Sequence, residues 1–144
     1  EAFTAAFTEK VKTLKQGDKY DLSTEIGAMA REDLAIEIEE MVKQSLSEGA
    51  TLHCGGKRTG AFYEPTVLTG VTPTMRVFRE ETFGPVAVIT TFRDFEEAIA
   101  LSNQSDFGLG VAIFSQNVDF VKSQAPRFEE GAVYINEMST GVPD

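Results

Sequence analysis

The sequence predicts an α/β fold in which a largely parallel sheet is flanked by helices. Its composition is that of one ordinary globular domain, with 144 residues of which 42% are hydrophobic and 25% charged. In the second half, apolar runs of strand length alternate with amphipathic helical segments, which is typical of parallel β-α-β units. The sequence contains no internal repeat, low-complexity tract or linker that would divide it.

Two helices are expected in the first half of the chain. Residues 2–15 repeat apolar side chains at helical spacing, and residues 30–47 do so over a longer stretch that Gly49 follows, where a left-handed residue is often needed. The predicted apolar face of the first helix consists of Phe3, Phe7, Val11 and Leu14, and that of the second of Leu34, Ile38, Met41, Val42 and Leu46. Residues 20–29 lack a period and are expected to form an ordered loop.

Strands are expected where β-branched and aromatic residues form short apolar runs. These runs are residues 51–54, 63–68, 86–92, 109–114 and 132–135. Pro65 is expected to keep its strand near a sheet edge, because proline cannot donate to a β-ladder. The β-rich apolar run at 86–92 is expected inside a sheet.

Two helix starts are expected in the second half. Asp94 and Glu97 resemble a capping box, in which Asp94 accepts from the helix backbone and Glu97 reaches back. Asn117 is expected to cap a second short helix. The inward side chains of the first of these helices are expected to be Phe95, Ala98 and Ile99.

The charge and the cysteine usage exclude several kinds of partner. The formal net charge is −10 and no Lys/Arg cluster exists, so we expect no nucleic-acid partner and no binding to anionic membranes. No apolar run approaches the ~20 residues that span a bilayer. The single cysteine, Cys54, cannot form an internal disulfide, which fits a cytoplasmic protein.

Three patterns that suggest a site fail on inspection. Residues 55–60 have the glycine spacing of a P-loop, but Ala61 follows where a lysine is required. Residues 108–110 lack the third glycine of a dinucleotide fingerprint and precede a strand. His53 and Cys54 have no further ligand at suitable spacing, so no metal site is expected.

Residues 80–86 carry the most information, with the sequence Glu-Glu-Thr-Phe-Gly-Pro-Val. They allow two interpretations. In the first, they are a charged loop that leads into a strand. In the second, one carboxylate accepts hydrogen bonds from sugar hydroxyls while the ring of Phe83 covers a flat heterocycle, and Gly84 and Pro85 fix the backbone so that both groups point one way.

This segment resembles the cofactor-side motif of the aldehyde dehydrogenase superfamily. Further segments resemble the same family in order along the whole chain, namely residues 63–66, 97–99, 103–110 and 131–136. The resemblance implies a fold of the aldehyde dehydrogenase catalytic-domain type and oxidation of an aldehyde to a carboxylic acid with NAD or NADP, through a cysteine thioester. Residues 29–34 and 78–79 are similar to bacterial NAD(P)-dependent succinate-semialdehyde dehydrogenases, so succinate semialdehyde is the expected substrate.

The resemblance also implies roles for individual residues. Glu81 would hold the nicotinamide ribose hydroxyls, and Phe83 would pack beside the nicotinamide ring, whereas the neighbouring Glu80 is expected to point away. Residues 136–140 would form the turn and the loop that line the substrate entrance, where Ser139 and Thr140 would donate hydrogen bonds to a distal carboxylate. A homo-oligomer, dimer or tetramer, is expected for the full-length enzyme.

No catalytic residue is expected within the chain itself. In the family the nucleophilic cysteine, the general base and the cofactor-binding domain precede the region matched by residues 1–144, and a further segment follows it. Cys54 is expected to be an ordinary strand residue, with His53 pointing to the opposite face. Two alternatives stay open: a dehydrogenase for another small aldehyde, and a non-catalytic structural or assembly module of the same fold.

Overall fold

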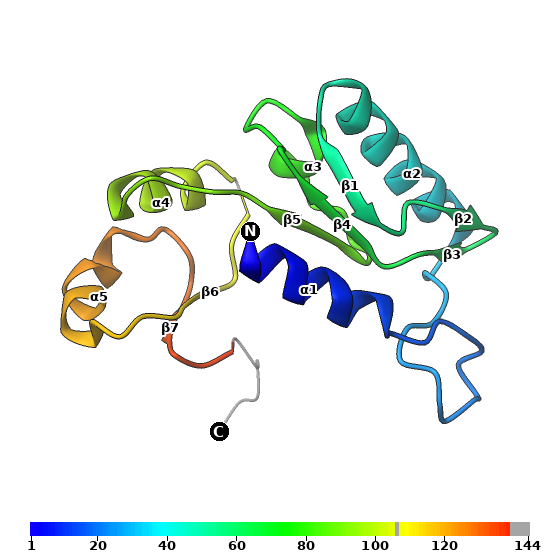
Figure 1. The fold of residues 1–144 in the computed structure, drawn as a ribbon, viewed down its shortest axis with the longest axis horizontal. Coiled ribbons are helices and arrows are strands. Elements are labelled where there is room, and N and C mark those ends of the chain that lie inside the picture. Colours follow the sequence, from blue (N-terminus) through cyan, green and yellow to red (C-terminus); the bar gives the residue numbers. More distant parts are fainter. Residues whose placement is uncertain (106, 139–144) are drawn as a thin grey trace. The chain divides into compact units, whose positions relative to one another are not determined.

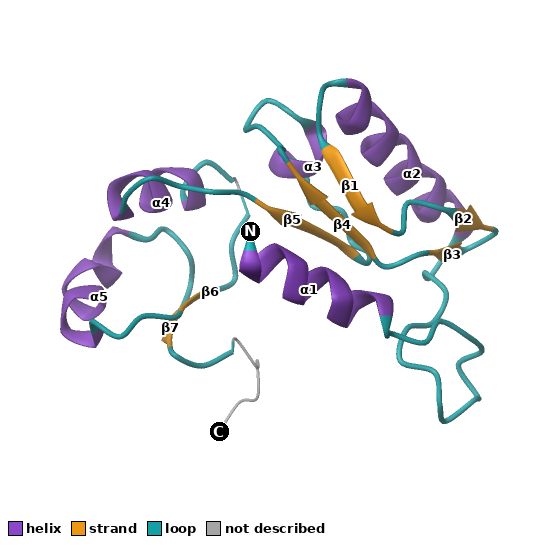
Figure 2. Cartoon of the chain, viewed as in Figure 1, coloured by secondary structure: helices purple, strands orange, loops and turns teal. Residues whose placement is uncertain are grey.

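The computed structural model describes residues 1–105 and 107–138 (Figure 1). The chain divides into two compact units, Glu1–Thr91 and Phe92–Asp144. Both combine helices with short strands (Figure 2), so the predicted α/β class is confirmed. Within the described ranges, every helix is too short or too polar to cross a lipid bilayer.

A three-stranded sheet forms the centre of the first unit. It contains β1 (Thr51–Cys54), β4 (Thr66–Thr69) and β5 (Val86–Ile89) in the order β1-β4-β5. Strand β1 runs antiparallel to β4, and β4 runs parallel to β5 from the Thr66–Val86 pair onward. The sheet is therefore mixed, and among the described strands the parallel pairs are β4-β5 here and β6-β7 in the second unit.

The expected positions of two strands within the sheet are wrong. Strand β4 lies at the centre, because Pro65 precedes its first residue and its missing N–H interrupts no ladder bond. The first ladder donor is the N–H of Thr66, which donates to the Pro85 carbonyl at 2.8 Å. Strand β5, which was expected inside a sheet, lies at the edge of this sheet within the described residues and is only half-buried.

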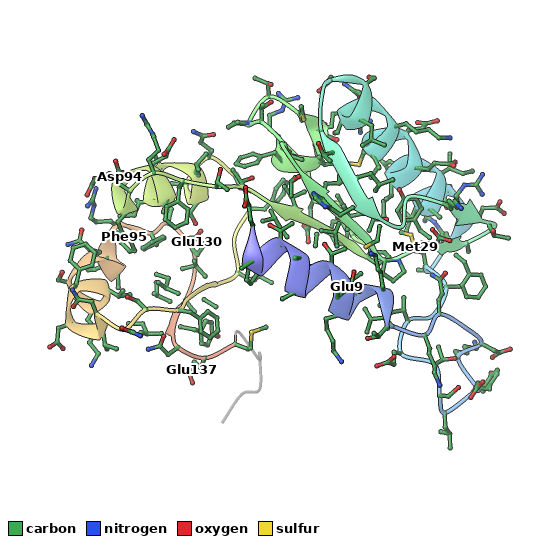
Figure 3. All side chains as sticks on the ribbon, in the orientation of Figure 1. Glu9, Met29, Asp94, Phe95, Glu130 and Glu137 are labelled. Carbon is green, nitrogen blue, oxygen red and sulfur yellow. The ribbon has the colours of Figure 1, made fainter. Side chains whose placement is uncertain are left out.

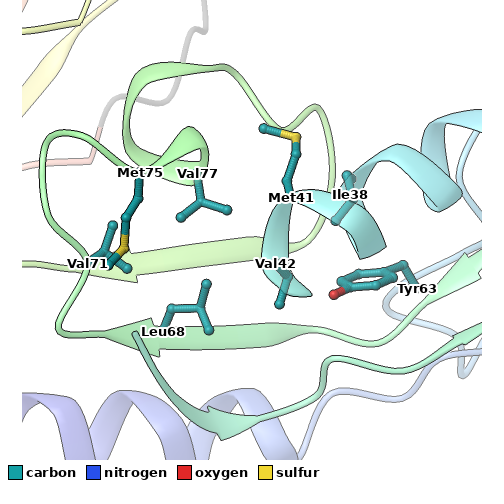
Figure 4. Packing of buried hydrophobic residues seen from close by; sticks show 8 residues of the cluster. All are labelled: Ile38, Met41, Val42, Tyr63, Leu68, Val71, Met75 and Val77. Atoms are coloured by element: carbon teal, nitrogen blue, oxygen red, sulfur yellow. The ribbon is translucent and has the colours of Figure 1, made fainter. Parts of the chain in front are cut away.

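Helix α2 (Glu32–Ser47) builds the hydrophobic core on one face of this sheet. Ile38, Met41 and Val42 of α2 are buried in this core (Figure 4), as the sequence periodicity predicts. The helix begins at Glu32 rather than at residue 30, because the backbone of Arg31 is extended. The fully buried cluster comprises Ile38, Met41, Val42, Tyr63, Leu68, Val71, Met75 and Val77.

Helix α1 (Ala2–Lys12) packs on the other face of the sheet and is shorter than expected. The buried residue of α1 is Thr8, whereas Phe3 is 67% exposed, so the predicted apolar face is only partly correct. Residues 20–29 form an ordered loop as expected, and a parallel bridge between Gln16 and Ile26 closes it.

Three short elements of the first unit have no counterpart in the sequence prediction. Strands β2 (Arg58–Thr59) and β3 (Phe62–Tyr63) form a hairpin. Helix α3 (Arg76–Arg79) follows β4 and contacts α2. All three are too short to show a repeating pattern.

The second unit contains α4 (Phe95–Ser102), β6 (Val111–Ile113), α5 (Val118–Gln124), the 3₁₀ helix η1 (Ala125–Arg127) and β7 (Val133–Ile135). Strands β6 and β7 are parallel, as expected for a β-α-β unit. Asp94 lies at the start of α4 (Figure 3), and its carboxylate accepts from the Glu97 N–H at 2.9 Å. Glu97 reaches back one residue further than a capping box requires, to the N–H of Arg93 at 2.7 Å. The Asn117 side chain caps α5 by accepting from the Phe120 N–H, as predicted.

The buried phenol of Tyr63 leads to a prediction on alkaline stability. Its side chain is 1% exposed, its hydroxyl has no hydrogen-bond partner among the described residues, and burial raises its pKa to about 12. Between pH 10 and pH 12 the unfolded chain loses this proton while the folded chain keeps it, so stability present below pH 10 is lost as the pH rises. We expect the free energy of unfolding of Tyr63→Phe, measured by urea denaturation, to rise by roughly 1.3 kcal/mol relative to that of the wild type between pH 9 and pH 11.

Tyr20 provides the matched control, because it is 84% exposed. Tyr20→Phe is expected to follow the wild-type pH dependence. The same pH dependence in Tyr63→Phe and the wild type would contradict the assignment.

Candidate functional site

The loop between α3 and β5 presents the two side chains that the sequence assigns to the cofactor. Glu81 and Phe83 are both exposed, and Phe83 retains 75% of its free surface. Within the described residues, the Glu81 carboxylate takes part in no hydrogen bond or ion pair, so it is available to a ligand. The loop therefore displays a carboxylate and an aromatic ring two positions apart.

The end of this loop is fixed by a close approach to α2. A β-carbon added at Gly84 would lie 2.3 Å from Ile38 Cδ1 and 3.2 Å from Met29 Cε, so no larger residue fits there without a shift. Ile38 is itself 1% exposed and cannot move into solvent. A residue with a β-carbon at position 84 would therefore require the ends of the Ile38 and Met29 side chains to shift. The next residue, Pro85, joins the sheet through its carbonyl, as described above.

The strained backbone of this loop lies at Phe83, with φ of 46°. A left-handed conformation costs a residue with a β-carbon about 1–2 kcal/mol. Such a conformation persists only where the surrounding structure imposes it, and it is frequent at ligand-binding loops. An exposed ring on a strained backbone favours a binding role for Phe83 over a packing role.

The start of the loop is held by Arg76, which the sequence analysis did not single out. Its Nη2 lies 2.7 Å from Glu80 Oε2, and its Nε donates to Glu80 Oε1 at 3.0 Å. This hydrogen bond lowers the pKa of Glu80 and raises that of Arg76. Glu80 is therefore turned back onto α3. That it points away from the cofactor stays a prediction.

In the second unit, Asn136 holds the end of β7 against the end of β6. Its φ of 58° is left-handed, and its side-chain amide bonds twice to the backbone of Ser115. Asn136 Oδ1 accepts from the Ser115 N–H at 2.8 Å, and Nδ2 donates to the Ser115 carbonyl at 2.9 Å. The chain then leads to the exposed Glu137 (Figure 3). The residues expected to contact substrate, Ser139 and Thr140, lie outside the described residues.

Cys54 and His53 are ordinary members of β1. Cys54 Sγ lies 3.8 Å from the Pro65 carbonyl, and His53 Nε2 lies 2.8 Å from Thr69 Oγ1. A bulge between Leu52 and Cys54 breaks the alternation of side chains, so the expectation that His53 and Cys54 face opposite sides is wrong. Across residues 1–105 and 107–138, no three His, Cys, Asp or Glu side chains are grouped so as to hold a metal ion.

Comparison with known proteins identifies the family. Residues 1–144 match the model of the aldehyde dehydrogenase family over their whole length. The chain belongs to the aldehyde dehydrogenase family. This aldehyde dehydrogenase segment is 45% identical over 138 residues to the NAD(P)+ succinate semialdehyde dehydrogenase of Escherichia coli (strain K12), covering 94% of the chain and 30% of that protein. It is 41% identical over 145 residues to the NADP+ succinate-semialdehyde dehydrogenase of Deinococcus radiodurans, covering 99% and 30%.

Solved aldehyde dehydrogenases have the same fold. A succinic semialdehyde dehydrogenase from Streptococcus pyogenes in complex with NADP+ matches with a TM-score of 0.90 and 34% identity, covering 99% of the chain and 32% of that structure. Aldehyde dehydrogenase 21 from Physcomitrella patens in complex with succinate matches with the same score and identity, covering 96% and 29%. The chain spans about 30% of the length of the curated relatives it matches.

Proposed function

We propose that this chain is part of the catalytic domain of an enzyme that oxidises an aldehyde to a carboxylic acid with NAD or NADP. The observation that carries the proposal is the pair of exposed side chains, Glu81 and Phe83, on a loop held at both ends. Several solved relatives are complexes with NAD+ or NADP+, which supports the same ligand here.

The two side chains suit the nicotinamide end of the cofactor. When bound, the cofactor would accept a hydride from the substrate. An unpartnered carboxylate at Glu81 can accept two hydrogen bonds from adjacent ribose hydroxyls, and an exposed ring at Phe83 can cover one face of a flat heterocycle. These contacts would orient the nicotinamide ring without supplying a nucleophile or a base.

The nucleophile and the general base belong, in this proposal, to other parts of a longer enzyme that works through a cysteine thioester. Several large apolar side chains are exposed. This supports the proposal that further protein covers them, either more of the same polypeptide or a second copy in a homo-oligomer. Large apolar residues with high exposure are Leu22 at 104%, Leu109 at 95% and Phe114 at 63%.

Succinate semialdehyde is the proposed substrate. The first two relatives described above are named for it, and the Physcomitrella structure is described as holding its product, succinate. A second candidate is another small anionic aldehyde, because the chain is also 40% identical over 138 residues to a 3-sulfolactaldehyde dehydrogenase of Priestia megaterium. Ser139 and Thr140 are the residues proposed to donate hydrogen bonds to the distal acidic group.

The first expected outcome concerns the chain by itself. Purified as 144 residues, it should form no NAD(P)H with succinate semialdehyde, because its only cysteine, Cys54, sits in a strand against the Pro65 carbonyl. The measurement is the absorbance of reduced cofactor at high enzyme concentration. Turnover that Cys54→Ser abolishes would contradict this part of the proposal.

The second expected outcome concerns Glu81 in the full-length enzyme. Glu81→Gln should lower kcat by roughly tenfold to a hundredfold with a smaller change in cofactor Kd, because misplacing the ring affects hydride transfer more than binding. The kinetic isotope effect with deuterated aldehyde should rise. An unchanged kcat and isotope effect would contradict the cofactor role of Glu81.

The third expected outcome concerns recognition of the distal acidic group of the substrate. Changing both Ser139 and Thr140 to Ala should raise KM for succinate semialdehyde, because each hydrogen bond to a charged group is worth roughly 1.5–3 kcal/mol. KM for an uncharged aldehyde of similar length serves as the control and should change less. Equal changes in both KM values would show that these residues do not read the carboxylate.

A further inference from the structure

Arg76 lies where two carboxylates from different elements meet, at the start of the Glu81–Phe83 loop. Its guanidinium binds Glu80 in a bidentate manner and lies 3.8 Å from Glu37 Oε1 of α2. The Arg76 side chain is 27% exposed, so the group is partly withdrawn from solvent. Bidentate pairs of this kind fix geometry as well as adding charge attraction.

Helix α3, which carries Arg76, is too short to be stable by itself. It has four residues, and neither of its ends has a side-chain cap. Glu80 is at once the residue that ends α3 and the residue that begins the loop, and its N–H donates to the Arg76 carbonyl at 2.8 Å. The conformation of the loop start therefore depends on the contact between Arg76 and its two carboxylates.

The two ends of the loop are held by neighbouring residues of one helix. Glu37 of α2 lies beside Arg76 at the loop start. Ile38, the next residue of α2, packs closely against the backbone of Gly84 at the loop end. The backbone strain at Phe83 lies between these two points. Helix α2 thus serves as a common support for both ends, and the segment that displays Glu81 spans between them.

Replacing Arg76 with a neutral residue would remove a positive charge from among several carboxylates, in addition to its hydrogen bonds. The carboxylates of Glu37, Glu40 and Glu80 all act on the guanidinium, and Arg79 also acts on Glu80. Without Arg76, acidic groups from α2 and from the loop would face one another with one cation fewer. Their repulsion would push the loop start away from α2.

We propose that Arg76 is a positioning residue, which acts through Glu80 to hold Glu81 and Phe83 in the geometry that orients the nicotinamide ring. This inference rests on the proposed function, because it assigns Arg76 a part in the same cofactor contact. Arg76 itself touches neither cofactor nor substrate in this account.

The test uses the full-length enzyme with Arg76→Gln and Arg76→Lys, each alone and combined with Glu81→Gln. Arg76→Gln should lower kcat by about tenfold and raise the isotope effect with deuterated aldehyde, while cofactor Kd changes less than about threefold. Arg76→Lys keeps the charge but not the bidentate contact, so it should fall in between. In the Glu81→Gln background, Arg76→Gln should cause little further loss, because both changes act on one contact.

The matched control is Arg93→Gln, which breaks the similarly spaced Arg93–Glu97 pair of the second unit. It should leave kcat, Kd and the isotope effect unchanged. A purely structural role for Arg76 would lower the melting temperature and the fraction of active enzyme but leave the isotope effect of the remaining enzyme unchanged, and that result would overturn the inference.

The remaining outcomes separate the inference from the proposed function. If Glu81→Gln slows hydride transfer and both Arg76 variants do not, the inference fails and the cofactor role of Glu81 stands. The inference is also overturned if the reductions in kcat caused by Arg76→Gln and Glu81→Gln are fully additive in the double variant. If Glu81→Gln has no effect, the cofactor role itself fails, and the inference fails with it.

Discussion

The close approach of Gly84 to Ile38 is the constraint on which the first unit depends. It brings the backbone that leads into β5 within reach of α2 at a place where a single methyl group would collide with a buried side chain. Interiors are packed densely, so relieving such a contact would require the ends of the Ile38 and Met29 side chains to shift. The position of α2 on the sheet, the start of β5 and the end of the Glu81–Phe83 loop are therefore set together.

The fold could be predicted where a local pattern determines the structure. The sequence correctly predicts the long periodic stretch of α2, the strand that ends at Cys54, and the caps at Asp94 and Asn117. The errors arise where tertiary context decides. The sequence does not reveal that Pro65 stands one residue outside its strand, or that α1 buries Thr8 in preference to Phe3.

The candidate site could be predicted only in part. Glu81 and Phe83 are predicted from a family motif, and the structure adds that both are exposed on a loop between α3 and β5. The contacts of Arg76 with Glu80 and Glu37 could not be predicted, because four-residue spacing to Glu80 is common on helices and Glu37 is distant in the sequence. The reason for glycine at position 84 likewise depends on Ile38, a residue that no local pattern connects to it.

The connectivity of the central sheet has a consequence for the order of folding. Thr51 pairs with Thr69 and Thr66 pairs with Val86, so roughly twenty residues of chain separate each pair of partners. Loops of that length close quickly and at modest entropic cost. The sheet and α2 are thus able to assemble from nearby segments during synthesis. The strained turn at Phe83 would then be imposed by a scaffold built from segments that lie near it in the sequence.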